Sequence, residues 1–338
     1  MPDTAHQTLT QIDGPLAMDQ TLRNPARRFP GRDDARCAEG MLLPQITPGF
    51  RLTPGEAVFT IGSCFARNVE EALARAGLRV PTAAFSAPEA EAPGRPNRLL
   101  NQYSPATMLQ CLRDAEGEET GAGLYPVGNE AAGSDDDGGD GDLVLDGLLA
   151  TGSRPVPRPR ALERRAQIRR LYAEGLAASD TVIVTLGLIE SWFDRLSGLY
   201  LNEAPTRRLL RAEPERFAFH RLGPDACRDM LFEMMDRLAI EGGQRVLLTV
   251  SPVPLQVTFA GGDAVTRNAC SKAVLRVVAE EAADRFDRVD YFPSYEMVAS
   301  LGLSAFGEDN VHVRPAVVDR VIAHMTAHYL TERLEGVA

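Results

Sequence analysis

The chain has 338 residues, 44% of them hydrophobic, which is enough for one large α/β domain or two smaller ones. Its formal net charge of −11 argues against nucleic acid as a partner, because binding a phosphate backbone requires a basic surface. The five cysteines are odd in number, and no pair has the spacing of a zinc site. We therefore expect reduced thiols in a cytoplasmic protein, and no metal.

The amino-terminal segment, residues 1–50, is rich in proline, aspartate and arginine and shows no clear hydrophobic period. Its first 20 residues lack a basic stretch followed by an apolar run, so they do not resemble a signal peptide. The chain has no run of about eighteen apolar residues, so we expect no membrane span. The sequence predicts an irregular arm over 1–50 and one main domain over 51–334.

Short apolar, β-branched runs alternate with segments of helical periodicity in the main domain. The first strand is predicted at 56–62, followed by a helix at 66–76 and a second short strand near 78–84. Further strands are predicted at 181–187, 245–251 and 289–293, and helices at 105–114, 161–177, 224–240, 268–285 and 315–334. This alternation predicts an α/β fold with a mostly parallel, doubly wound sheet.

An insertion of about residues 86–160 interrupts this pattern. It contains an acidic, glycine-rich stretch at about 130–142. The acidic residues do not have the spacing or the closing glutamate of a calcium loop. The composition instead predicts a solvated, mobile loop.

In a doubly wound sheet, ligands bind beyond the carboxyl ends of the strands, so the residues just after each strand are of most interest. The first predicted strand ends in Gly62-Ser63-Cys64, with two nucleophile candidates at a strand-to-helix turn. A helix N-terminus contributes only about 0.3–1 kcal/mol, less than the 1.36 kcal/mol of one pKa unit. A hydroxyl or thiol at this turn therefore needs a base.

Asp309 and His312 are the candidate base. They lie three residues apart in a turn between the last predicted strand and the last predicted helix. At that spacing, the carboxylate can accept a hydrogen bond from one imidazole nitrogen while the other nitrogen faces the nucleophile.

Further candidates follow the later strands. Gly187 and Glu190 come after the strand at 181–187, where Glu190 could face the cleft. Asn268 could cap the helix predicted to begin there. Lys272 is the only lysine in an arginine-rich chain, and it could hold a substrate anion or pair with Glu190.

Taken together, these segments resemble the GSCFA family, a branch of the SGNH/GDSL hydrolase superfamily. The Gly-Ser-Cys-Phe-Ala run at 62–66 is the most specific part of the match. This run lies within a matching segment at 60–68, and the other matching segments lie at 185–190, 249–252, 271–272, 291–296 and 309–312. The resemblance implies a three-layer α/β/α sandwich of flavodoxin-like topology, with a nucleophile after the first strand and a terminal Asp-x-x-His motif.

The superfamily's Gly-Asp-Ser block places Cys64 at the nucleophile position, with Ser63 as the alternative. Arg67 and Asn68 fit this register, because they are similar to the Arg-Asn pair of the related plant polysaccharide O-acetyltransferases. The superfamily's oxyanion asparagine would fall on Ile189, whose side chain cannot donate. A replacement donor could be the backbone amide of Cys64 or a side chain from residues 101–103, which include Tyr103.

The resemblance implies an acyl-ester hydrolase or O-acyltransferase without a cofactor, acting on a small-molecule or saccharide ester. The acyl group would pass to Cys64 while His312, oriented by Asp309, acts as the base. The alternative is a catalytically degenerate module that binds a carbohydrate or a nucleotide. A metal site of Cys64, His312 and Asp309 is disfavoured, because the spacing of structural metal ligands is absent.

Overall fold

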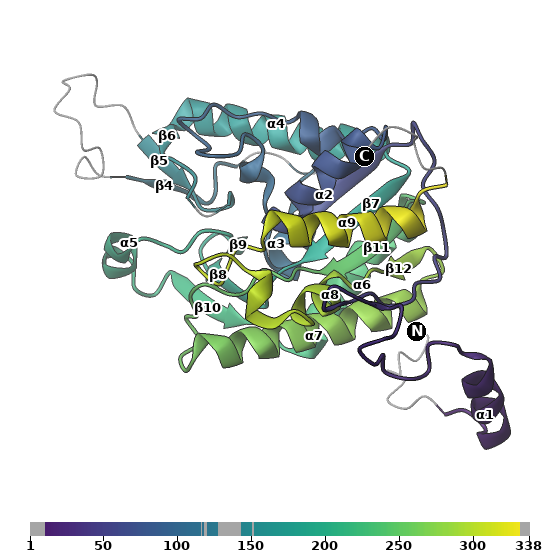
Figure 1. Ribbon diagram of the computed structural model, residues 1–338. Coiled ribbons are helices and arrows are strands. Elements are labelled where there is room, and N and C mark those ends of the chain that lie inside the picture. Colours follow the sequence, from purple (N-terminus) through teal and green to yellow (C-terminus); the bar gives the residue numbers. More distant parts are fainter. Residues whose placement is uncertain (1–10, 116, 118–119, 128–142, 151, 332–338) are drawn as a thin grey trace.

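The computed structural model describes residues 11–115, 117, 120–127, 143–150 and 152–331 (Figure 1). The acidic stretch predicted as a mobile loop, 130–142, lies outside the described residues, as do residues 332–334 of the last predicted helix. Within the described residues, every helix is too short or too polar to span a membrane.

A four-stranded parallel sheet forms the centre of the molecule, as the alternating pattern predicts. Its strand order is β12-β11-β7-β3. The strands are β3 (Val58–Gly62), β7 (Thr181–Leu186), β11 (Arg245–Val250) and β12 (Val289–Tyr291). Every residue of β3 and β7 is buried, which explains why these strands read as nearly continuous apolar runs.

The second strand predicted near 78–84 does not form. Only an isolated bridge joins Ala57 to Arg79, where the Val58 N–H donates to the Arg79 carbonyl oxygen at 2.8 Å. Pro81 then begins the 3-10 helix η1 (Pro81–Ala84), because proline lacks the N–H that a longer ladder requires. The chain still passes along the outer edge of β3 before it returns to form β7 on the other side of β3. The order in which the chain adds strands to the sheet therefore reverses between β3 and β7, the position at which doubly wound folds bind ligands.

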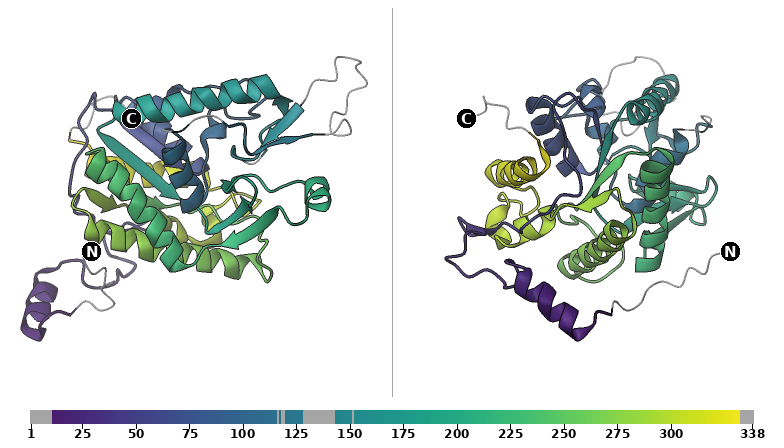
Figure 2. Two further views of the ribbon diagram at one scale, coloured as in Figure 1. Left: turned by 180° about the vertical axis from the view of Figure 1, so that it is seen from behind. Right: turned by 90° about the vertical axis from the view of Figure 1, so that its right-hand side faces the viewer.

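Helices cover both faces of the sheet (Figures 1 and 2). On one face, alternate strand residues such as Ile183 and Leu247 pack against apolar side chains of three helices. These helices are α2 (Cys64–Arg75), α8 (Ser294–Ala299) and α9 (Pro315–Tyr329).

The opposite face carries the larger apolar cluster. Val182 and Val184 point into it and pack against the second set of helices. These are α3 (Pro105–Asp114), α4 (Arg158–Ala177), α6 (Pro224–Met235), which continues into the π-helix η4 (Asp236–Glu241), and α7 (Ala264–Arg285). Although α3 comes from the predicted insertion, its residues Met108 and Leu109 belong to this main core.

Two small antiparallel sheets extend from the carboxyl-terminal side of the main sheet. One sheet, of order β10-β8-β9, begins four residues after β7 ends. Its strands are β8 (Glu190–Asp194), β9 (Leu199–Leu201) and β10 (Phe217–Arg221), with α5 (Arg207–Ala212) between the last two. The second sheet contains β4 (Leu124–Pro126), β5 (Leu143–Asp146) and β6 (Val156–Pro157).

The amino-terminal arm is not wholly irregular, so that prediction is wrong in part. It contains α1 (Gly14–Arg23), which has no buried residue and lies away from the body of the protein in Figure 1. Later in the arm, β1 (Cys37–Ala38) pairs with β2 (Met41–Leu42). Met41 is fully buried against the helices of the main domain. The second half of the arm is therefore part of the core.

Gly62, the last residue of β3, occupies a conformation that only glycine adopts easily. Its φ is +146°, and a Cβ there would lie 2.5 Å from the carbonyl oxygen of Thr185 in β7. The Gly62 carbonyl oxygen accepts a 2.9 Å hydrogen bond from the N–H of Gln102. Glycine therefore lets β3 end in close contact with β7, while its carbonyl group binds the segment around Gln102.

We expect Gly62→Ala to lower the free energy of unfolding by about 3 kcal/mol, because an unfavourable φ and an overpacked contact add together. Gly55→Ala is the matched control. Gly55 also has a positive φ, +87°, but no atom lies within 4 Å of a Cβ built there. Its loss should be nearer 1 kcal/mol in urea unfolding. Equal losses in the two variants would show that the close contact with Thr185 is unimportant.

Candidate functional site

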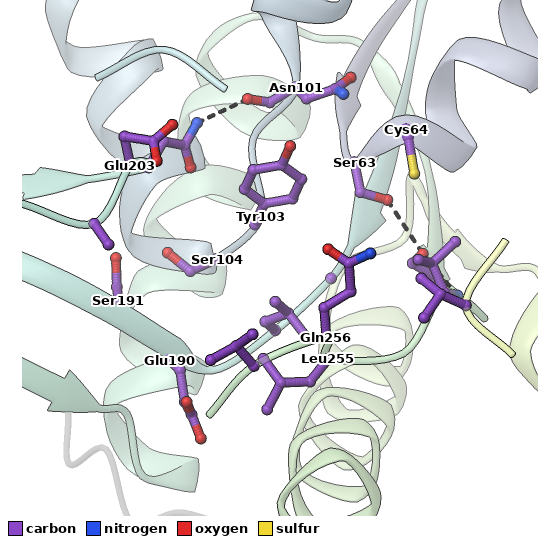
Figure 3. Close-up of a pocket in the computed structure, with 18 of the residues that line it drawn as sticks. Ser63, Cys64, Asn101, Tyr103, Ser104, Glu190, Ser191, Glu203, Leu255 and Gln256 are labelled. Atoms are coloured by element: carbon purple, nitrogen blue, oxygen red, sulfur yellow. Dashed lines mark hydrogen bonds between the residues drawn. The ribbon is translucent and has the colours of Figure 1, made fainter. Parts of the chain in front are cut away.

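A cavity of about 700 Å³ opens at the carboxyl ends of the parallel strands. Its wall includes residues that follow three strands and two residues of the turn before α9, one of which is His312. They include Ser63 and Cys64 after β3, Gly187 and Leu188 after β7, Ser251 and Val253 after β11, and His312. The sheet therefore brings the nucleophile turn and His312 to one cavity, part of which Figure 3 shows.

Ser63 and Cys64 occupy different environments at the start of α2. Ser63 is only 4% exposed, and its hydroxyl donates a 3.1 Å hydrogen bond to the Ser251 hydroxyl (Figure 3). Cys64 is the first residue of the helix, and it is partly exposed in the cavity wall. The thiol is therefore the more accessible of the two nucleophile candidates.

The surroundings of Cys64 favour its neutral form. Burial raises the pKa of its thiol, and the positive charges of Arg95 and Lys272 oppose that rise only in part. Arg95 is held beside the turn by the Asn68 side-chain oxygen, to which it donates at 3.0 Å, and by an ion pair with Glu71. At neutral pH the thiol therefore keeps its proton until a base removes it.

Asp309 and His312 form a compact pair in the turn before α9. The imidazole Nδ1 is hydrogen-bonded to one Asp309 carboxylate oxygen, and the other oxygen accepts from the N–H groups of Val311 and His312 at 3.0 Å. The hydrogen bond from His312 is the main reason that the pKa of Asp309 is lowered to about 2. The carboxylate stays charged and orients the ring, as the spacing predicts.

The His312 ring does not contact the nucleophile turn in this structure. Its side chain is 71% exposed. Within the part of the chain that the structure describes, no hydrogen bond joins the imidazole to Cys64 or to Ser63. The structure therefore provides an oriented imidazole in the wall of the cavity that is not hydrogen-bonded to the thiol.

The segment around Asn101 reaches the same cavity from between η2 (Arg98–Leu100) and α3. Asn101 is buried, and its side chain lies beside Ser63 with Tyr103 close by (Figure 3). The Asn101 side-chain oxygen has no hydrogen-bond partner. Burial raises the pKa of Tyr103 to about 12, so its phenol is neutral and remains a donor.

Gly187 allows this segment to dock against the end of β7. A Cβ at Gly187 would lie 2.6 Å from the Tyr103 carbonyl oxygen, which accepts a 2.7 Å hydrogen bond from the N–H of Leu188. At the end of β3 the segment is held by the backbone hydrogen bond from Gln102 to the Gly62 carbonyl oxygen, and the missing Cβ of Gly62 instead admits Thr185 of β7. Both glycines therefore permit close backbone contacts at the strand ends, a role that the sequence did not indicate.

Lys272 is fully buried on α7 and does not line the cavity. Its Nζ donates to the carbonyl oxygens of Gly187 and Val253 at 2.8 Å each, so it links the ends of β7 and β11. The predicted pairing with Glu190 is wrong, because a long buried side chain reaches backbone carbonyls instead. Burial lowers the pKa of Lys272 from 10.5 to about 7. The neutral form of the amine still has two N–H groups, one for each of the two carbonyl oxygens.

Asn268 and Glu190 also act on the segment that follows β11. The prediction that Asn268 caps a helix is wrong, because α7 begins earlier, where Asp263 accepts from the second and third N–H groups of the helix. The Asn268 side-chain oxygen instead accepts from the N–H of Leu255 at 3.0 Å. Glu190 lines the cavity, but its carboxylate accepts from the Thr258 hydroxyl at 2.8 Å and from the Phe259 N–H at 3.2 Å.

Arg67 lies beneath the nucleophile turn and is 1% exposed. Its guanidinium pairs with the buried carboxylate of Glu70 and donates to the Thr60 hydroxyl at 3.3 Å. Arg67 therefore ties the first turn of α2 to β3 at the inner wall of the cavity, which it also lines. Within the described residues, no group of three or more His, Cys, Asp or Glu side chains could hold a metal ion.

We expect iodoacetamide to modify Cys64 more slowly than Cys270 at pH 7.5, by about fivefold or more, because the reagent attacks the thiolate and burial raises the pKa of Cys64. Cys270 is the internal control, since it is exposed. Peptide mapping by mass spectrometry gives both rates, and that of Cys64 should keep rising above pH 9. Faster labelling of Cys64 at neutral pH would mean that its thiolate is already formed.

The buried amine predicts a specific pH dependence of stability. Lys272 has a lower pKa when folded, about 7, than its usual 10.5, so the unfolded chain binds more protons between these values. The stability of the wild type relative to Lys272→Met should therefore rise between pH 7 and 9, by on the order of 1 kcal/mol per pH unit. Urea unfolding at several pH values measures this difference, and parallel pH curves for the two proteins would contradict the buried-amine assignment.

The model of the GSCFA family matches residues 57–325, a span that includes the parallel sheet, the turn at 62–64 and His312. No curated protein and no solved structure matches the chain.

Proposed function

The chain belongs to the GSCFA family, and from this premise we propose that it is an acyl-ester hydrolase or O-acyltransferase. The reaction would pass through a covalent acyl group on Cys64. The observation that carries the proposal is the shared cavity, whose wall contains an accessible thiol at a helix N-terminus and an imidazole oriented by a carboxylate. Helices on both faces of the parallel sheet support an SGNH-like sandwich.

In the first half-reaction, the His312 Nε2 takes the proton from the Cys64 thiol, and the thiolate attacks the carbonyl carbon of the ester. The tetrahedral intermediate collapses when the C–O bond to the alcohol breaks, and His312 returns the proton to the departing alkoxide. In the second half-reaction, water or another hydroxyl attacks the thioester with His312 again as base. The C–S bond then breaks, the acyl product leaves, and His312 returns its proton to the sulfur to restore the thiol.

Cys64 is a better nucleophile candidate than Ser63 on two grounds. The Ser63 hydroxyl is buried and directs its proton to Ser251, whereas the Cys64 thiol faces the cavity. A thiol also needs less activation than a hydroxyl. The exposed His312 ring would approach the thiol when substrate fills the cavity, since catalytic hydrogen bonds are often long before a substrate binds.

Asn101 is our candidate for the oxyanion donor. Ile189, which stands at the superfamily's asparagine position, is buried, and its N–H donates to the Ser271 hydroxyl at 3.0 Å. The Asn101 amide instead lies beside the nucleophile turn (Figure 3). The N–H groups at the start of α2 and the Tyr103 hydroxyl could assist it. Losing one oxyanion donor typically costs about 2.7–4 kcal/mol in known enzymes.

The alcohol part of the ester would lie along the polar wall of the cavity. Asn101, Asn202, Glu203 and Arg98 line this side and offer both donors and acceptors. Such groups suit a polyol, which agrees with the acylated carbohydrate implied by the resemblance to SGNH/GDSL hydrolases. Reduced Cys64 would also suit the cytoplasmic location expected from the cysteine pattern.

Two observations favour a second candidate function. The imidazole makes no hydrogen bond to Cys64, and the usual oxyanion asparagine is replaced by Ile189. A protein that keeps the cavity without turnover would be a binding module for a carbohydrate or a nucleotide. Binding that persists in His312→Ala, with no activity on any ester, would support this alternative.

Hydrolysis of aryl esters and of acetylated sugars tests the proposal. Cys64→Ala and His312→Ala should each lower kcat/KM by about a hundredfold or more, because each removes one half of the nucleophile–base unit. Asn101→Ala should lower kcat by about a hundredfold with little change in KM. Cys270→Ala removes an exposed cysteine elsewhere and should retain full activity. Full activity in Cys64→Ala would exclude the thiol as the nucleophile.

A further inference from the structure

Three aromatic rings form one end of the cavity wall. Trp192 on β8, Phe219 on β10 and Phe259 in the loop after β11 all line the cavity. Each ring contacts the other two. The ring centroids are 5.5 Å apart for Trp192 and Phe219, 5.2 Å for Trp192 and Phe259, and 5.8 Å for Phe219 and Phe259. We call these three residues the aromatic cluster.

Aliphatic side chains extend the apolar surface on the same side of the cavity. Leu188, Leu255 and Val257 line it together with the aromatic cluster. Figure 3 shows Leu255 and Glu190 across the cavity from Asn101 and Glu203. The cavity therefore has a polar wall and an apolar wall, and both belong to the site that contains Cys64.

The Gln256 amide faces the cavity beside Leu255 (Figure 3), but the other polar groups of the apolar wall are poorly placed to bind sugar hydroxyls. The Glu190 carboxylate already accepts from the Thr258 hydroxyl and the Phe259 N–H, and the Ser191 hydroxyl donates to the Leu201 carbonyl oxygen at 3.2 Å. The Trp192 indole N–H is buried, so it does not face a ligand. Polar groups that are already bonded would give little selectivity for a polyol.

The ring geometry also disfavours a sugar on this wall. Trp192 meets Phe219 at 66° and Phe259 at 71°, so the contacts are edge to face. Such contacts cover part of the flat ring faces on which a pyranose would stack. Val257 and Phe259 are nevertheless 61% and 51% exposed, so a large apolar surface stays in contact with water. An apolar ligand would remove that surface from water.

We propose that the apolar wall binds the acyl chain of the substrate and that the chain is longer than acetyl. That the bound group is an acyl chain attached to Cys64 rests on the proposed function. With the carbonyl carbon at the Cys64 sulfur, the chain would run past Leu188 and Leu255 to the aromatic cluster. The alcohol part would face the opposite, polar wall, so the two walls select the two halves of the ester.

Trp192 provides a direct probe of this proposal, because it is the only tryptophan in the chain. We would titrate Cys64→Ala, which cannot form the thioester, with sodium butyrate, hexanoate, octanoate and decanoate while recording tryptophan fluorescence. Each added CH₂ should lower Kd about fourfold, because its burial removes apolar surface from water. The readout is binding alone, so it stands or falls separately from any measurement of turnover.

Phe259→Ala, made in the same Cys64→Ala background, should weaken octanoate binding about tenfold and change butyrate binding by less than about twofold, since only the longer chain reaches the aromatic cluster. Phe29→Ala is the matched control, because Phe29 is 86% exposed in the amino-terminal arm. It should bind every carboxylate as the parent does. Affinities independent of chain length, or a fluorescence response to glucose and cellobiose but not to octanoate, would overturn the proposal.

Discussion

Close approach of one backbone segment to the ends of two strands shapes the whole cavity. Residues 101–103 lie against both strand ends, because the Gln102 N–H donates to the Gly62 carbonyl oxygen and the Leu188 N–H donates to the Tyr103 carbonyl oxygen. The contact at β7 requires glycine at 187, where a Cβ would lie 2.6 Å from the Tyr103 carbonyl oxygen, whereas the glycine at 62 lets β3 approach Thr185 of β7. The same contact places Asn101 beside the Ser63–Cys64 turn and Tyr103 next to it. A side chain at Gly187 would push the polar wall away from the thiol, and one at Gly62 would disturb the end of β3 from which the thiol projects. The position of the proposed oxyanion donor therefore depends on Gly187, which need not touch substrate.

Two buried basic side chains support this arrangement in different ways. Arg67 keeps its charge by pairing with Glu70, because an unpaired guanidinium inside the protein would be strongly destabilising. Lys272 has only backbone carbonyl partners, and burial lowers its pKa to about 7. An arginine could not lose its proton in this way. This difference gives a physical reason for one lysine in a chain that otherwise uses arginine, and it makes Lys272 a positioning residue for the ends of β7 and β11.

The parallel sheet could be predicted because its strands are buried on both faces and therefore appear in the sequence as apolar runs. The Asp309–His312 pair could be predicted because the two residues are only three positions apart. Other features depend on contacts between distant parts of the chain. Pro81 stopped the expected second strand, Asp263 began α7 before Asn268, and the partners of Lys272 lie on loops far away in sequence. The position of Asn101 beside Ser63 also follows from tertiary packing. Local patterns carry no information on such contacts, although the glycine ending β3 was a usable signal.

The central claim is that Cys64 carries the acyl group, and intact-mass trapping tests it most directly. The protein would be mixed with an activated octanoyl ester, quenched in acid within seconds, weighed whole, and then digested to locate the added mass. The account predicts one octanoyl group per chain on the peptide containing Cys64, with no adduct in Cys64→Ala and an unchanged adduct in Cys270→Ala. An octanoyl group mapped to Ser63, or an adduct that persists in Cys64→Ala, would contradict it.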